Sequence, residues 1–169
     1  MQSIRRILVV IEPDAETDQA ESLAMRRACL LADHTGASLH LLVCDKHSNH
    51  AELLTTLKHD LLAEDFNVTA QQDWHESVHQ TIINVQQAEG SDLVIKQHFP
   101  DSPLKKALLT PDDWKLLRYC PCPVLLVKTD RPWKGSPVLA AVDVGNPDGE
   151  HCALHHSIVQ YGYDLARLT

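Results

Sequence analysis

Three soft or borderline metal ligands lie close together in the first half of the chain. Cys44, His47 and His50 follow the apolar run Leu39–Val43 at intervals of three residues. Thiolate and imidazole groups gathered in one loop could hold zinc or copper, and ligands of α/β proteins commonly bind where a parallel strand ends. The alternative is a polar loop that opens a helix in a histidine-rich chain. Zinc is the one cofactor that the sequence suggests, and both interpretations stay open.

Two further groups share metal-binding spacings. His75–His79 fits H-E-x-x-H, in which a helix presents two zinc ligands and a general base. It directly follows an expected strand, however, and no third ligand is placed, so we expect a fortuitous match. Near the C-terminus, four side chains form two pairs spaced by four residues: His151/His155 and Cys152/His156. These pairs could bind nickel or zinc, and the interpretation that we favour is a solvated helix whose covering domain is missing.

Other reactive residue types do not assemble into catalytic machinery. Cys120 and Cys122 are separated by one proline, which is tight for an internal disulfide, and a redox role would need an exposed thiolate of low pKa. Asp112 and Asp113 follow a threonine and a proline, which is typical of a helix start. The chain has no glycine-rich P-loop and no nucleophile elbow. We therefore expect a protein without catalytic residues.

Composition excludes several classes of protein. The 169 residues carry 15 Lys+Arg against 23 Asp+Glu, for a formal charge of −8, which disfavours binding to a nucleic-acid backbone. No apolar run approaches the roughly 18 residues of a membrane helix. The apolar run Ile7–Ile11 ends at Glu12, too early for a signal peptide. Five cysteines, an odd number, indicate free thiols, and we expect a cytoplasmic protein.

Five short apolar runs predict the strands. They are continuous rather than alternating, as in parallel strands covered on both faces, and they are Ile7–Ile11, Leu39–Val43, Leu93–Ile95, Val124–Val127 and Val138–Val142. The polar stretch Asn67–Trp74 is an edge strand at best. Stretches of helical periodicity separate the runs, and two of them stop at Gly36 and Gly90. Alternating strands and helices predict an α/β sheet.

The end of the chain repeats its beginning. Residues 130–136 contain proline and glycine and are interpreted as a linker. The run Val138–Val142 then leads through Asp143 into an expected helix, as Ile7–Ile11 does through Glu12. We expect one whole domain over residues 1–129 and the first strand and helix of a second, truncated domain over 137–169. In isolation, we expect the amides of that second helix to be poorly protected from hydrogen exchange, or the helix to dock against another chain and promote association.

The residues resemble the universal stress proteins. The resemblance rests on three segments: the first strand, which ends in an acid, the strand from Asp92 to Ile95, and the segment Cys120–Val127. The motif over Thr110–Pro121 and the tandem layout resemble the universal stress protein E branch in particular. The resemblance implies a doubly wound, flavodoxin-like sheet of five parallel strands in order 3-2-1-4-5. It also implies a homodimer or pseudo-dimer through the fifth strand, formed by Val124, Leu125, Leu126 and Val127.

Many members of this family bind ATP through a glycine pattern after the fourth strand, where backbone amides cradle phosphates. The matching positions hold Gln97, Pro100 and Thr110, followed by Pro111, so the spacing survives and every glycine is gone. Prolines remove amide donors, and side chains crowd a phosphate. The acid that contacts the nucleoside is Glu12 in place of aspartate; the matching acid of the second copy is Asp143.

The resemblance therefore implies a non-enzymatic stress-response protein that binds a ligand or a partner and has lost its nucleotide loop. Two alternatives remain from the residues themselves: a zinc-binding module, or a weak nucleotide binder. A nucleotide-hydrolysing enzyme is disfavoured, because no general base is placed to activate water.

Overall fold

The computed structural model describes residues 4–13, 22–98, 111–143, 145 and 149–168. Contacts between residues divide the chain into two compact units at Thr129/Asp130. The first unit spans residues 4–129, and residues 130–169 belong to the second. Each unit is described by itself.

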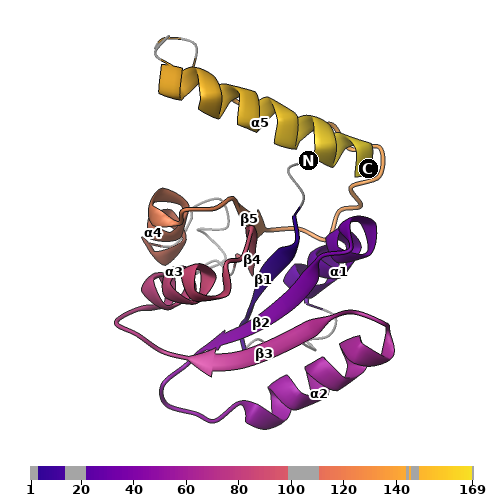
Figure 1. Ribbon diagram of the computed structural model, residues 1–169, viewed down its shortest axis with the longest axis vertical. Coiled ribbons are helices and arrows are strands. Elements are labelled where there is room, and N and C mark those ends of the chain that lie inside the picture. Colours follow the sequence, from indigo (N-terminus) through magenta and orange to yellow (C-terminus); the bar gives the residue numbers. More distant parts are fainter. Residues whose placement is uncertain (1–3, 14–21, 99–110, 144, 146–148, 169) are drawn as a thin grey trace. The chain divides into compact units, whose positions relative to one another are not determined.

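A five-stranded parallel sheet forms the centre of the first unit (Figure 1). Its strands are β1 (Arg6–Ile11), β2 (Ser38–Cys44), β3 (Val68–Asp73), β4 (Leu93–Gln97) and β5 (Val124–Val127). Their order is β3-β2-β1-β4-β5, with parallel pairing throughout. The predicted α/β fold class and strand order are confirmed. Residues 7–11 of β1 are all buried, which explains why the sequence of this central strand shows no alternation.

Helices cover both faces of this sheet (Figure 1). They are α1 (Leu23–Thr35), α2 (Ala51–Ala63), α3 (Val78–Glu89) and α4 (Pro111–Tyr119). On one face, α3 and α4 supply Ile82, Ile83, Val85 and Leu116 to a core shared with side chains of β1, β2 and β4. The other face is covered by α1, which contacts β1, β2, β4 and β5, while α2 packs against β3.

The helix ends follow local sequence rules. Ser22 and Ser77 are N-caps whose hydroxyls accept hydrogen bonds from the backbone N–H groups of Met25 and Gln80. Gly36 and Gly90 end α1 and α3 in the left-handed conformation, at φ of 72° and 63°. Thr110, the expected cap of α4, lies outside the described residues, and α4 begins at Pro111.

The two edge strands differ in character. The β3 strand is largely polar, as the sequence predicted for an edge, whereas β5 consists of one leucine pair between two valines. Val124, Leu125 and Leu126 are only half-buried. An exposed apolar edge is a template for pairing with another strand.

The second unit contains one long helix, α5 (Gly149–Leu168). The strand predicted over Val138–Val142 is wrong, because these residues adopt no regular structure and are exposed. Strands need partners for their backbone groups, and the described part of this unit offers none. The segment instead contacts its own helix: a Cβ added at Gly162 would lie 3.5 Å from the Ala140 side chain. No helix in the described residues has the length and apolar character needed to cross a membrane.

Candidate functional site

A lysine is buried where β4 ends, surrounded by carboxylates from two other elements. Lys96 is 7% exposed. Its Nζ lies 3.0 Å from Oε1 of Glu12, the residue after β1, and 3.4 Å from Oδ1 of Asp113 in the first turn of α4. Because the carboxyl ends of parallel strands form the usual ligand-binding edge of such a sheet, this cluster is the candidate site.

The residues after Lys96 tie the same edge to two helices. Gln97 Oε1 accepts a hydrogen bond of 2.9 Å from the backbone N–H of Leu23 at the start of α1. The next residue, His98, places Nδ1 2.7 Å from Oδ2 of Asp113, and both side chains are buried. The end of β4 is therefore fixed by side-chain contacts to both layers of helices.

Charge explains why this arrangement holds together. Burial lowers the pKa of Lys96, but the carboxylates of Glu12 and Asp113 outweigh it and raise that pKa above its ordinary value. The ammonium is therefore fully charged at neutral pH. Asp113 is completely buried, and a buried carboxylate persists only when paired and hydrogen-bonded. The site can neutralise and position charge, and the ammonium of Lys96 is already paired with the carboxylates of Glu12 and Asp113.

Sequence reasoning missed this cluster. Asp113 was interpreted as a helix cap; it does lie in the first turn of α4, but its carboxylate faces Lys96 and His98. Lys96 belongs to no motif, and it directly follows the apolar run Leu93–Ile95. That position was the available signal, since a lysine that continues a buried parallel strand must find counter-charges.

The structure does not assemble the expected metal ligands. Across the described ranges, no three His, Cys, Asp or Glu side chains are grouped to hold a metal ion. Cys44 is half-buried, and burial, with Glu12 nearby, raises the pKa of its thiol far above the ordinary value. His50 Nε2 lies 2.7 Å from Asp45 Oδ2, and His47 is exposed. These contacts fit the polar-loop interpretation.

The H-E-x-x-H segment has a structural role. His75 donates its backbone N–H to Thr81 Oγ1 at 2.9 Å. His79 Nδ1 lies 2.9 Å from both Ser77 Oγ and Asp112 Oδ1, so it connects α3 to α4. Each of the two acids in the first turn of α4 is thus in contact with a histidine, Asp112 with His79 and Asp113 with His98.

The expected nucleotide-loop positions are only partly described. Pro100 and Thr110 lie outside the described residues. Gln97 has its side-chain oxygen occupied by α1, and Pro111 is the first residue of α4. In the second unit, Asp143 Oδ1 accepts the backbone N–H of Gly145 at 2.8 Å, which is a local turn contact.

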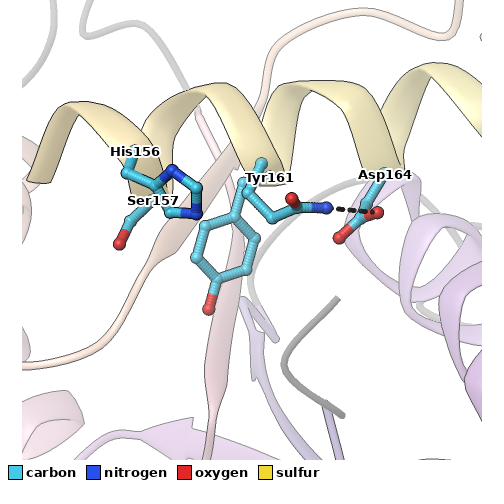
Figure 2. A pocket seen from close by; sticks show the side chains of 5 residues that line it. His156, Ser157, Tyr161 and Asp164 are labelled. Atoms are coloured by element: carbon cyan, nitrogen blue, oxygen red, sulfur yellow. Dashed lines mark hydrogen bonds between the residues drawn. The ribbon is translucent and has the colours of Figure 1, made fainter. Parts of the chain in front are cut away.

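The pocket in Figure 2 is lined by one face of α5, from His156 to Asp164. Gln160 donates from Nε2 to Asp164 Oδ1 at 3.1 Å, a contact between residues one helical turn apart. The predicted pair His151/His155 places its rings edge to face, 6.3 Å between centroids. Among the described residues, all that line this pocket come from α5.

Comparison with known proteins gives consistent matches. Residues 3–128 match the family model described as the universal stress protein family. Universal stress protein E of Escherichia coli is 38% identical over 94 residues, which cover 55% of this chain and 29% of that protein. The Photorhabdus laumondii protein of the same name is 27% identical, with 98% of this chain and 59% of that protein covered.

Solved structures agree with these matches. A crystal structure described as a universal stress protein from Pseudomonas aeruginosa has 59% identity and a TM-score of 0.89, covering 99% of this chain and 59% of that one. An Archaeoglobus fulgidus structure at 17% identity and TM-score 0.63 covers 75% of this chain and 44% of that one, and supports the fold alone. The present chain thus spans about three fifths or less of these relatives. On the family match, this chain belongs to the universal stress protein family.

Proposed function

We propose that this chain is a non-enzymatic, cytoplasmic stress-response module whose nucleotide edge does not take up ATP and which works by binding partners. The observation that carries the proposal is the 3.0 Å ion pair between Glu12 and Lys96 at the carboxyl edge of the sheet. Glu12 occupies the position whose acid contacts the nucleoside in ATP-binding members of the family. Here its carboxylate already has a cation.

Recruiting Glu12 to a ligand would be costly. The carboxylate would have to leave Lys96, which would then be buried beside Asp113 alone. The Glu12 side chain is partly exposed, so water would repay part of its loss, but the buried ammonium would lose its nearest carboxylate. The Gln97 side chain is equally occupied, by the first turn of α1. These contacts support the inference from the missing glycines that the loop no longer cradles phosphate.

Partner binding is supported by apolar surface around the edge of the sheet. On α4, Trp114 is 62% and Tyr119 60% exposed, and Leu117 is also exposed. The half-buried β5 edge follows α4 directly in the chain. Apolar side chains gathered on a surface mark interaction sites more often than chance. We place the partner, a second copy of the domain, on β5.

A calorimetric titration tests the nucleotide part of this proposal. Mg-ATP, AMP and cyclic AMP would be titrated into the metal-free chain; cyclic AMP is included because a family structure at 15% identity is described as a complex with it. We expect no binding heat up to millimolar nucleotide. The matched variant Glu12→Asp restores the family's acid. It should also give no binding heat, because Lys96 still neutralises the carboxylate at this position.

Saturable heat with a micromolar dissociation constant, equivalent to about −8 kcal/mol, would overturn the proposal. If only Glu12→Asp bound ATP, the acid would be the deciding residue and the argument from the loop would be wrong.

A further inference from the structure

Two thiols face each other in the connection between α4 and β5. Cys120 directly follows α4, and Cys122 stands two residues before β5. Their Sγ atoms are 3.8 Å apart, close enough for a hydrogen bond between the thiols. Both side chains are half-buried, packed against the core on the α3/α4 face yet still reached by solvent. The intervening Pro121 is exposed.

Cys29 and Cys44 differ from this pair. Cys29 lies within α1, where burial raises the pKa of its thiol to about 11. The Cys44 thiol is likewise shifted toward its neutral form. By contrast, the hydrogen bond with Cys122 lowers the pKa of Cys120 to about 7, against the opposing effect of burial. A nucleophilic thiolate beside a second, protonated thiol is the pairing that dithiol–disulfide chemistry requires.

We propose that Cys120 and Cys122 are a redox-active dithiol that exchanges electrons with low-molecular-weight disulfides of the glutathione class. The Cys120 thiolate attacks one sulfur of the oxidised disulfide, which breaks the S–S bond and releases one thiolate. Cys122 then gives up its proton to solvent and attacks Cys120 Sγ, which releases the second thiolate. The pair is oxidised by two electrons, and one disulfide becomes two thiols.

The geometry favours a labile disulfide over a structural one. The Sγ atoms must approach from 3.8 Å to the bonding distance of about 2.05 Å, within a loop that one proline constrains. The short spacing of the two cysteines disfavours a permanent disulfide, and for the same reason it favours a disulfide that is easily reduced again. Strained or exposed disulfides have more oxidising potentials and are the readily reversed ones.

The experiment is a redox titration of the full chain carrying Cys152→Ser, which removes an exposed thiol from the chemistry. The reduced protein would be equilibrated at graded ratios of oxidised to reduced glutathione, quenched in acid, alkylated and digested with trypsin. Residues 119–128 form one tryptic peptide that holds both thiols, and residues 28–46 hold Cys29 and Cys44. We expect peptide 119–128 to lose two hydrogen atoms and resist alkylation as the ratio rises, while peptide 28–46 stays fully alkylated.

Single substitutions resolve the two steps. Cys122→Ser should stop at a mixed disulfide between Cys120 and glutathione. Cys120→Ser should react with oxidised glutathione at least about tenfold more slowly, because the more nucleophilic thiolate is gone. The proposal is overturned if peptide 119–128 keeps two alkylated thiols at every ratio, or if wild-type glutathionylation at Cys120 persists without resolution. Equal oxidation of peptide 28–46 would overturn it as well.

Discussion

Burying a lysine in a parallel sheet is tolerable only when nearby charges compensate for its lost hydration. Lys96 has two such charges, Glu12 at 3.0 Å and Asp113 at 3.4 Å, and they come from segments on either side of it in the chain. One contact joins β4 to the end of β1, and the other joins β4 to α4. The cluster thus connects three elements at the carboxyl edge of the sheet, where ligands of parallel α/β sheets commonly bind.

Lys96→Met should therefore destabilise the fold strongly. Methionine fits the apolar part of the site but removes the ammonium that lies 3.4 Å from the fully buried carboxylate of Asp113. Removing one member of a buried pair costs about 3–5 kcal/mol of unfolding free energy. Urea denaturation followed by far-UV circular dichroism measures the loss.

The matched control is Lys115→Met, which changes an exposed lysine two residues beyond Asp113. It should alter the unfolding free energy by no more than about 0.5 kcal/mol. If Lys96→Met were as mild as this control, the ion pairs would not be holding the sheet edge together.

At this scale the sequence predicted little of the site. Glu12 and Gln97 were identified from the family pattern, but their contacts are with Lys96 and α1, to which the pattern gives no role. The dominant pairs join residues 84 and 17 positions apart in the chain. Spacing rules report on neighbours in one helix or strand, so contacts between elements escape them.

Elements were far more predictable, because their signals are local. The apolar runs coincide with β1, β2, β4 and β5, and the two glycine stops coincide with the left-handed caps of α1 and α3. The strand predicted at Val138–Val142 is wrong because that prediction, too, used only a local signal. An apolar run is necessary for a buried strand, but a strand also needs neighbours, which a local pattern does not report.

The β5 edge allows a selective test of self-association. The carbonyls of Pro123 and Val127 accept hydrogen bonds from Val94 of β4 and from His98, which directly follows β4. In a parallel ladder the alternate residue Leu126 therefore directs its N–H away from the sheet. Leu126→Pro should remove an outward donor without removing a hydrogen bond to β4. If two copies pair through β5, the sedimentation-equilibrium dimerisation constant should weaken by at least about tenfold, equivalent to about 1.4 kcal/mol.

Ala70→Pro is the matched control on the opposite edge. Asn67 accepts a hydrogen bond from β2, which gives Ala70 the same outward position on β3. This variant should dimerise like the unsubstituted chain. Equal weakening by both prolines would indicate general damage to the sheet, and no weakening by Leu126→Pro would place the dimer contact elsewhere.

Across the whole molecule, the two units differ sharply in what they bury. The first unit contains all of the described core, including the central strand β1. In the described part of residues 130–169, no side chain is buried, and Leu139 is 93% exposed. Most helix stability in proteins comes from packing an apolar face. The second unit should therefore contribute little to the cooperative unfolding of this chain.

Hydrogen exchange on a demonstrated monomer tests that inference. Amides of β1 and α1 should exchange only through global unfolding, which for a domain costs about 5–15 kcal/mol. Amides of α5 should exchange through local opening of a 20-residue helix that contains Gly149 and Gly162, at a cost near zero. Mass spectrometry of peptic fragments would then show α5 fully exchanged long before β1. Equal protection would mean that α5 unfolds only with the sheet, and the units would be one cooperative structure despite their unequal cores.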